Sequence, residues 1–125
     1  MQNYQKNSRK IGDIGERATA DFLLRNGYEI LKRNYTVRGG EIDIIARKGS
    51  VTCFVEVKTR KHDPLTSGED AITKAKKNHL IYAAQRYLDR LGEPCSARFD
   101  VAVVEHENGR VKKVRYYVSA FDASK

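Results

Sequence analysis

Three residues with the chemistry of a metal site lie in two strand-like runs that flank the Gly-Ser pair at 49–50: Asp43, Glu56 and Lys58. If 49–50 forms a two-residue hairpin turn, counting outward from it places Asp43 opposite Glu56. Two carboxylates about 5 Å apart at Cβ repel each other unless a cation lies between them. Carboxylate oxygens are hard ligands that suit Mg²⁺ or Mn²⁺. We therefore expect Asp43 and Glu56 to be metal ligands.

Lys58 follows Glu56 by two residues, so alternation places both side chains on one face of the strand. A metal on that face would polarise a phosphodiester and lower the pKa of a bound water, and Lys58 would orient the water or stabilise the developing charge. Ile45 and Phe54 share this face by the same counting. The opposite face is apolar and is expected to pack on the core; it holds Ile42, Ile44, Ala46, Cys53, Val55 and Val57.

A simpler interpretation of the same hairpin is open. Alternating charges on a strand commonly form a solvated face, and an exposed pair such as Glu41 with Lys58 contributes little to stability. The facing acids and the nearby lysine, on a strongly basic chain, favour a site over this alternative.

Hydrophobic spacing and turn residues predict the elements that must position the hairpin. In residue numbers they are a helix at 11–27, strands at 28–35, 41–47 and 51–60, a loop at 62–68, a long helix ending near 91, and strands at 97–104 and 111–118. The predicted turns are Gly39-Gly40, 49–50 and Asn108-Gly109. Ser67 and Asp70 form a capping box for the long helix.

This order, α-β-β-β-α-β plus a last strand, predicts an α/β fold with a mixed β-sheet flanked by helices. The first three strands form an antiparallel meander, and the long helix is a crossover to the fourth. We expect one domain at 11–120, preceded by a flexible basic arm at 1–10 and followed by a tail at 121–125.

Composition narrows the class of protein. The chain has 125 residues and a formal net charge of +8, which is typical of proteins that bind nucleic acids. No apolar run is long enough to cross a membrane and no secretory signal is evident, so a cytoplasmic protein is expected. Two cysteines without paired spacing and three scattered histidines argue against a disulfide framework and a zinc site.

Several motifs in the chain resemble those of the YraN family, small bacterial proteins with a restriction-endonuclease-like core. Asp43, followed after thirteen residues by Glu56-Val57-Lys58, also resembles the motif of the PD-(D/E)XK nucleases, a superfamily that includes restriction endonucleases and Holliday-junction resolvases. The motifs cover roughly residues 11–104: GDIGE at 12–16, GY at 27–28, GEIDIIA at 40–46, FVEVKTR at 54–60, Lys76, and AA at 83–84. Position 42 is Ile where the superfamily name has Pro, a tolerated departure.

The resemblance implies that Asp43 and Glu56 bind metal and that Lys58 assists catalysis. Glu16 matches a helix acid that reaches the metal site in related resolvases, although an acid is also favoured near the start of any helix. Arg60 and Lys76 match family positions and are expected to contact phosphate, while a solvated surface charge stays an equally open interpretation of each.

We therefore expect a Mg²⁺-dependent nuclease that hydrolyses phosphodiester bonds in DNA, with branched or structured DNA as an expected substrate. Arg38, Lys74 and Lys77 join Arg60 and Lys76 as expected nucleic-acid contacts. Symmetric cutting of two strands would favour a homodimer. Two alternatives stay open: a binding module that no longer cuts nucleic acid, and a basic protein that docks on a ribonucleoprotein.

Overall fold

The chain folds into one sheet with a helix on each face. The computed structural model describes residues 4–63 and 72–123. The elements are α1 (Tyr4–Arg25), β1 (Glu29–Val37), β2 (Gly40–Lys48), β3 (Val51–Lys61), α2 (Lys74–Leu91), β4 (Ser96–Glu107) and β5 (Arg110–Phe121). The predicted α/β class and element order, including the last strand, are confirmed.

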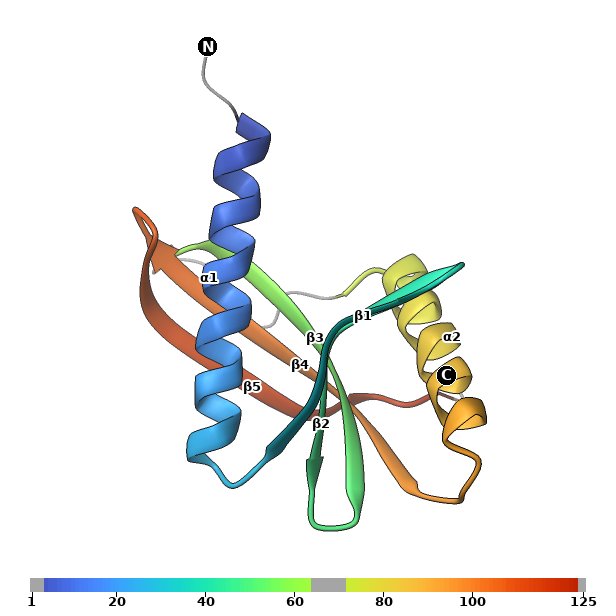
Figure 1. Ribbon diagram of the computed structural model, residues 1–125. Helices are drawn as coiled ribbons and strands as arrows, with labels where there is room; N and C mark the ends of the chain where they lie inside the picture. Colours follow the sequence, from blue (N-terminus) through green and yellow to red (C-terminus); the bar gives the residue numbers. More distant parts are fainter. Residues whose placement is uncertain (1–3, 64–71, 124–125) are drawn as a thin grey trace.

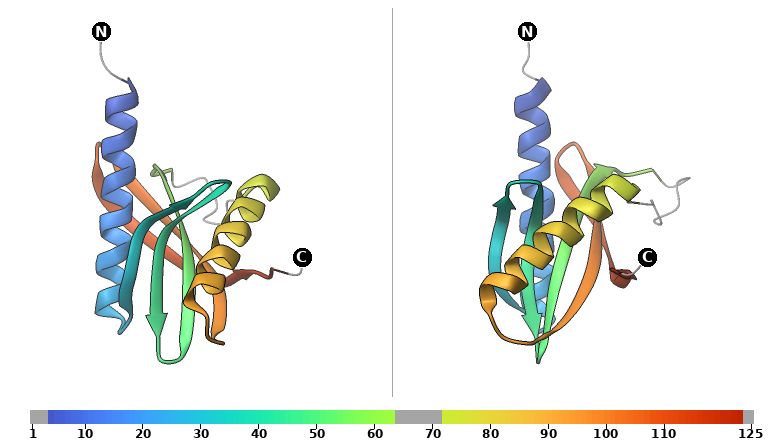
Figure 2. Two further views of the ribbon diagram at one scale, coloured as in Figure 1. Left: turned by 45° about the vertical axis from the view of Figure 1, so that its right-hand side comes forward. Right: turned by 90° about the vertical axis from the view of Figure 1, so that its right-hand side faces the viewer.

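The sheet has the strand order β1-β2-β3-β4-β5, and only β3 and β4 run parallel within this described sheet. A parallel pair needs a crossover connection, which here runs from β3 through α2 to β4. Figures 1 and 2 show α1 on one face and α2 on the other, so the sheet is the middle of three layers. Neither α1 nor α2, the helices of the described residues, is long and apolar enough to span a bilayer.

Two of the predicted hairpin turns are confirmed. Lys48 pairs with Val51 around the turn at 49–50, which fixes the register that the sequence predicted for the site hairpin. Asn108 and Gly109 both have positive φ, 53° and 82°, which a tight two-residue turn requires. The first turn lies one residue earlier than predicted, at 38–39.

The helix boundaries differ from the predicted ones. α1 begins at Tyr4 rather than near Ile11, so residues expected to form a basic arm are helical from Tyr4 onward (Figure 1). α2 begins at Lys74, where the Thr73 side chain accepts a hydrogen bond from Lys76 N as N-cap. The predicted capping box at Ser67 and Asp70 lies outside the described residues.

The C-terminal boundary also differs from the predicted one. β5 continues to Phe121, which was expected to begin the tail. Its ring stacks on Phe99 with 5.0 Å between centroids, so Phe121 is part of the packed sheet. The sequence pattern predicted an end at 118, and Ser119, the next residue, has a positive φ of 53° inside the strand.

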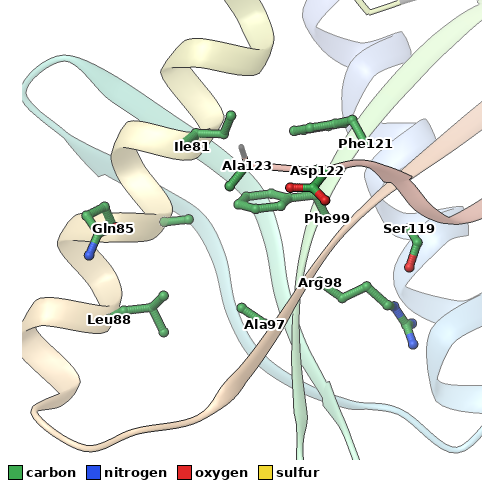
Figure 3. Close-up of a pocket in the computed structure, with 11 residues that line it drawn as sticks. Ile81, Gln85, Leu88, Ala97, Arg98, Phe99, Ser119, Phe121, Asp122 and Ala123 are labelled. Atoms are coloured by element: carbon green, nitrogen blue, oxygen red, sulfur yellow. The ribbon is translucent and has the colours of Figure 1, made fainter. Parts of the chain in front are cut away.

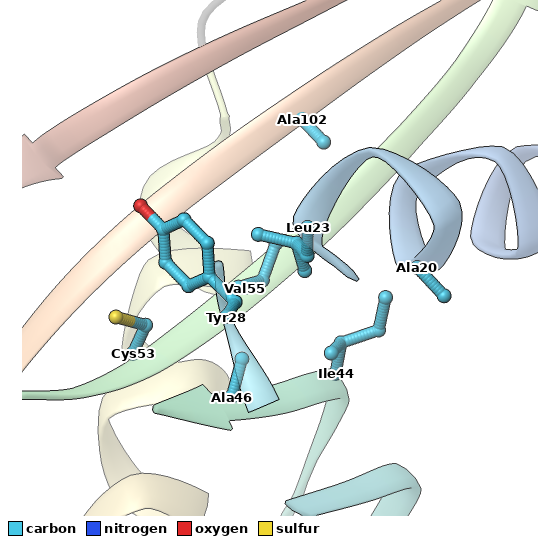
Figure 4. Packing of buried hydrophobic residues seen from close by; sticks show 8 residues of the cluster. All are labelled: Ala20, Leu23, Tyr28, Ile44, Ala46, Cys53, Val55 and Ala102. Carbon is cyan, nitrogen blue, oxygen red and sulfur yellow. The ribbon is translucent and has the colours of Figure 1, made fainter. Parts of the chain in front are cut away.

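Both faces of the sheet carry a hydrophobic cluster. The cluster under α1 joins helix side chains to β2, β3 and β4 (Figure 4); its buried members are Ala20, Leu23, Tyr28, Ile44, Ala46, Cys53, Val55 and Ala102. The cluster under α2 consists of Ile42, Ile45, Phe54, Leu80, Ala83, Ala84 and Phe99. Covering both faces holds the central hairpin between two helices.

The predicted division of the hairpin into a polar and an apolar face is wrong in two respects. Ile45 and Phe54, expected on the polar face, are fully buried under α2. Ile42 packs under α2 although Ile44 packs under α1, so the alternation breaks at Asp43. Asn34, the neighbouring position on β1, has a positive φ of 53°. Counting residues outward from the turn assumes regular strands and therefore does not predict this irregularity.

Candidate functional site

An acid-lined cavity of about 320 Å³ lies where β2 and β3 separate. Both helices reach it, one from each face of the sheet. Its lining residues are Ile11, Gly12 and Glu16 of α1, Glu41 and Asp43 of β2, Glu56, Val57 and Thr59 of β3, and Lys76 of α2. Four carboxylates therefore line one cavity in a protein with a net charge of +8.

Asp43 marks the point where the two strands part. The regular ladder between β2 and β3 extends as far as Ile44 and Val55. Beyond it, the Val57 backbone N–H donates to Asp43 Oδ2 at 2.8 Å, so a side chain takes over the pairing role of the β2 backbone. Burial raises the pKa of Asp43 and the charge of Glu41 adds to the rise, although the Val57 hydrogen bond opposes it.

Among the acids of the cavity, Glu56 has the most strongly raised pKa. Its side chain is only 13% exposed, and burial, followed by the charge of Asp43, raises its pKa from 4.5 to about 7. Lys76 Nζ lies 3.3 Å from Glu56 Oε2 and opposes this rise. The predicted repulsion between Asp43 and Glu56 is therefore present, and a cation from α2 partly relieves it.

Glu16 enters the cavity from the opposite face, on α1. Arg33 Nη2 lies 3.8 Å from Glu16 Oε1. With its amide nitrogen turned toward the carboxylate, Asn34 donates to Glu16 Oε1 at 3.1 Å and Oε2 at 3.3 Å. Burial raises the pKa of Glu16 and the charge of Asp43 adds to this effect. Glu16 thus belongs to the same electrostatic cluster as Asp43.

Two glycines let the helices approach the strands that carry the acids. A Cβ at Gly15 would collide with Thr59 Oγ1, so α1 lies directly on β3 beside Glu16. A Cβ at Gly40 would collide with the carbonyl oxygen of His79, so α2 lies equally close to the start of β2. An added side chain would force α2 or β2 to move at Gly40, where it meets backbone, and would force the Thr59 side chain or α1 to move at Gly15.

The predicted lysines are placed differently from one another. Lys76 lines the cavity, whereas Lys58 is half-buried on β3 and is not among the described residues that line it. Lys77 points elsewhere, with Nζ 5.5 Å from the centroid of the Phe121 ring. Lys74 is exposed in the first turn of α2.

The two predicted arginines lie outside the cavity lining. Arg38 is exposed in the turn between β1 and β2. Arg60 Nη2 lies 3.0 Å from Oε2 of Glu105, a carboxylate that is 1% exposed. Arg115 and His62 contact the same carboxylate, and these hydrogen bonds lower the pKa of Glu105 to about 2. Arg60 thus holds a buried acid, a partner on β4 that its position on β3 does not reveal.

Asn34 and Arg33 are site residues that the sequence analysis missed. Both come from β1, which carries no acid of the predicted site. A signal did exist, because asparagine is enriched at positive φ and is disfavoured inside strands. An asparagine within a strand pattern, beside the hairpin that carries the acids, indicates an irregular position near the site.

The described residues contain no preformed cluster of three or more His, Cys, Asp or Glu side chains with metal-ligand geometry. The acids of the cavity are instead held by protein groups. Asp43 contacts a backbone N–H, Glu56 contacts Lys76, and Glu16 contacts Asn34 and Arg33. A divalent cation would have to rearrange or replace some of these contacts.

A larger cavity of about 480 Å³ lies between α2 and the β4–β5 part of the sheet (Figure 3). Its wall includes the apolar side chains Ile81, Leu88 and Phe99. Figure 3 shows the Arg98 side chain directed away from α2; its guanidinium contacts Asp100 and Tyr28 on the α1 side. This lining lacks the converging acids of the cavity at Asp43 among the residues that the structure describes.

Comparison with known proteins finds relatives in several bacteria. The model of the "Uncharacterised protein family UPF0102" matches residues 15–104. A UPF0102 protein of Symbiobacterium thermophilum is 47% identical over 118 residues, which cover 93% of this chain and 99% of the relative. One of Chlorobium chlorochromatii is 49% identical over 92 residues, or 74% and 71% of the two chains. One of Trichlorobacter lovleyi is 40% identical over 121 residues, or 94% of each. These matches confirm the YraN-like resemblance, and the chain belongs to the uncharacterised protein family UPF0102.

Proposed function

We propose that the chain is a cytoplasmic, divalent-metal-dependent nuclease with a restriction-endonuclease-like core that hydrolyses phosphodiester bonds in DNA. The observation that carries the proposal is the convergence of Asp43, Glu56 and Glu16 on one cavity, where the pKa of each is raised. Keeping several acids close together costs stability, so their presence indicates a role that needs them.

The donor set suits a hard cation. Mg²⁺ usually binds one or two carboxylates and keeps several waters, and the cavity offers carboxylates and open volume. Asp43 and Glu56 would hold the cation, and the hydrogen bond from Val57 N to Asp43 Oδ2 fixes the orientation of the Asp43 carboxylate. When bound there, the cation would supply Lewis acidity toward a phosphodiester and activate water.

Each remaining residue has a role that follows from its position. Glu16, held by Asn34 and Arg33, would orient water or the outer coordination sphere from α1. Lys58, two residues beyond Glu56 on β3, would stabilise negative charge on the phosphate. The net charge of +8, with Arg38 and Lys74 on the surface, would attract the DNA backbone.

Metal binding tests the first part of this proposal. Isothermal titration of the full chain with Mn²⁺ at pH 8 should show one site that is lost in Asp43→Asn and in Glu56→Gln. Asp21→Asn is a matched control, because Asp21 is exposed on α1 outside the cavity lining. Equal heats in the parent and in Asp43→Asn would refute the assignment.

Cleavage tests the second part. Linear, nicked, flapped and four-way-branched DNA should be offered with Mn²⁺ to the parent, to Asp43→Asn and to Lys58→Met. We expect cutting by the parent, loss in the first variant and a drop of about 10²-fold or more in the second, since charge stabilisation of this kind is worth that much. Variants that cut as well as the parent would show that the activity arises elsewhere.

A non-catalytic nucleic-acid-binding module is the second candidate. The observation that favours it is Lys76, which already supplies a positive charge to Glu56 without a metal. This candidate predicts DNA binding whose logarithmic affinity falls linearly with the logarithm of salt concentration, without a Mn²⁺ site. A flat salt dependence would favour a protein partner, as expected for docking on a ribonucleoprotein.

A further inference from the structure

Lys76 is the cation that the cavity itself supplies. Its Nζ lies 3.3 Å from Glu56 Oε2, and its side chain lines the cavity together with Asp43 and Glu16. The partners differ in exposure, because Glu56 is 13% exposed and Lys76 is 66% exposed. Lys76 therefore reaches from the surface toward a largely buried acid, and it can leave without disrupting the core.

The place of Lys76 in α2 is unusual for a lysine. Lys74, Lys76 and Lys77 all lie in the first turn, which contains no acidic residue. The N-terminus of a helix carries a partial positive charge, so lysines there are disfavoured unless they meet an anion. The Lys76 backbone is also fixed, because its N–H donates to the Thr73 cap at 3.2 Å.

We propose that Lys76 is an exchangeable counter-ion of the site: it neutralises Glu56 when no metal is bound, and it binds the phosphate backbone of the nucleic acid once a divalent cation takes Glu56. This proposal rests on the proposed function and gives Lys76 of α2 a binding role beside the role proposed for Lys58 of β3. The Lys76 ammonium group has an anionic partner in both states: the Glu56 carboxylate without metal, and a phosphate when metal and nucleic acid are bound.

The exchange couples two binding events. The cation must compete with Lys76 for Glu56, so the lysine weakens metal binding in the absence of nucleic acid. Once displaced, the ammonium group strengthens nucleic-acid binding. Because coupling between ligands is reciprocal, nucleic acid also strengthens metal binding.

Metal titration of the full chain tests the first half of the proposal. At pH 8, we expect Lys76→Met to bind Mn²⁺ about two- to fivefold more tightly than the parent, the range expected from removing one partly exposed ion pair. Lys74→Met is the matched control, because it removes the same charge from the same turn at a side chain that is not among the described residues lining the cavity. Its Mn²⁺ affinity should stay within about twofold of that of the parent.

Fluorescence anisotropy with a labelled four-way DNA junction tests the second half, with Ca²⁺ as the divalent ion and the DNA checked for cutting. At constant ionic strength, Ca²⁺ should increase the DNA affinity of the parent, and this gain should be at least about threefold smaller in Lys76→Met. In EDTA, Lys76→Met should bind DNA no more weakly than Lys74→Met, which has the same net charge, because Lys76 of the parent is then engaged with Glu56.

The outcomes separate this inference from the proposed function. If the parent takes up no Mn²⁺, the metal site fails and the exchange fails with it. If the parent binds Mn²⁺ and Lys76→Met binds it equally or more weakly, the metal site stands and the exchange is overturned. The exchange is also overturned if the gain from Ca²⁺ in DNA affinity is the same in Lys76→Met and in the parent.

Discussion

Replacing Glu56 by Gln should stabilise the metal-free protein at high pH and leave it unchanged at low pH. The folded state raises the pKa of Glu56 from 4.5 to about 7. Between these values the folded chain keeps a proton that the unfolded chain has lost, so the free energy of unfolding falls as the pH rises. Glutamine does not titrate, so Glu56→Gln avoids that loss.

The structure sets the size of the effect. Each tenfold change in an ionisation constant corresponds to about 1.4 kcal/mol, so the rise to about 7 gives a ceiling of about 3 kcal/mol above pH 8. Glu56 is 13% exposed and ions reach the cavity, so screening should reduce this ceiling to about 2 kcal/mol. For a domain of this length that corresponds to a rise of about 8 °C in Tm.

Thermal unfolding followed by circular dichroism measures this directly, in EDTA at pH 4.5 and at pH 8. We expect the Tm of Glu56→Gln to exceed that of the parent at pH 8 and to match it at pH 4.5. Glu93→Gln, at an exposed position after α2, is the control and should change neither value. An unchanged or lower Tm for Glu56→Gln at pH 8 would refute the argument that burial and Asp43 make ionised Glu56 unfavourable.

Three further substitutions test the packing around the site, each by chemical denaturation at pH 7. Gly15→Ala should lower the free energy of unfolding by about 1–3 kcal/mol, because the added methyl group collides with Thr59; an unchanged midpoint would contradict the close approach of α1. Glu105→Gln should cost about 1–3 kcal/mol through weaker hydrogen bonds to groups such as Arg60. Because the pKa of Glu105 is lowered to about 2, the parent loses this advantage as the pH falls from about 4.5 toward 2, and a constant difference would count against the cluster. Thr73→Ala should cost about 1 kcal/mol by removing the N-cap of α2, and Thr73→Ser should restore it.

The hairpin was the most predictable part of the molecule. A Gly-Ser turn fixes the register of the strands beside it. The convergence of Asp43 and Glu56 on the cavity where β2 and β3 separate therefore follows from counting residues outward from the turn. Counting also gave a wrong prediction, because it assumed that side chains alternate regularly between the two faces of the sheet on both sides of Asp43. The positive φ of Asn34 is indicated by its residue type and not by hydrophobic spacing, so counting alone did not predict it.

Residues that act from other elements were harder to predict. Lys58 lies close to Glu56 in the sequence, whereas Lys76 lies far from every acid of the site. Lys76 lines the cavity because α2 packs against the sheet beside Glu56, and this packing is not visible in the sequence. Arg60 shows the same limit, because its partner Glu105 lies on β4, far along the chain. The start of α1 at Tyr4 was not predicted, because the largely polar residues 4–10 lack the apolar spacing that indicates a helix.

The cavity draws one wall from each helix, Glu16 from α1 and Lys76 from α2, and these helices lie on opposite faces of the sheet. A partly folded chain that keeps the five strands but has released either helix would therefore have an incomplete site. A complete site therefore requires that both helices have docked on the sheet, so we expect a chain with one helix released to lack the chemistry proposed for the intact cavity. Local detachment of one helix should switch the site off before the sheet itself melts.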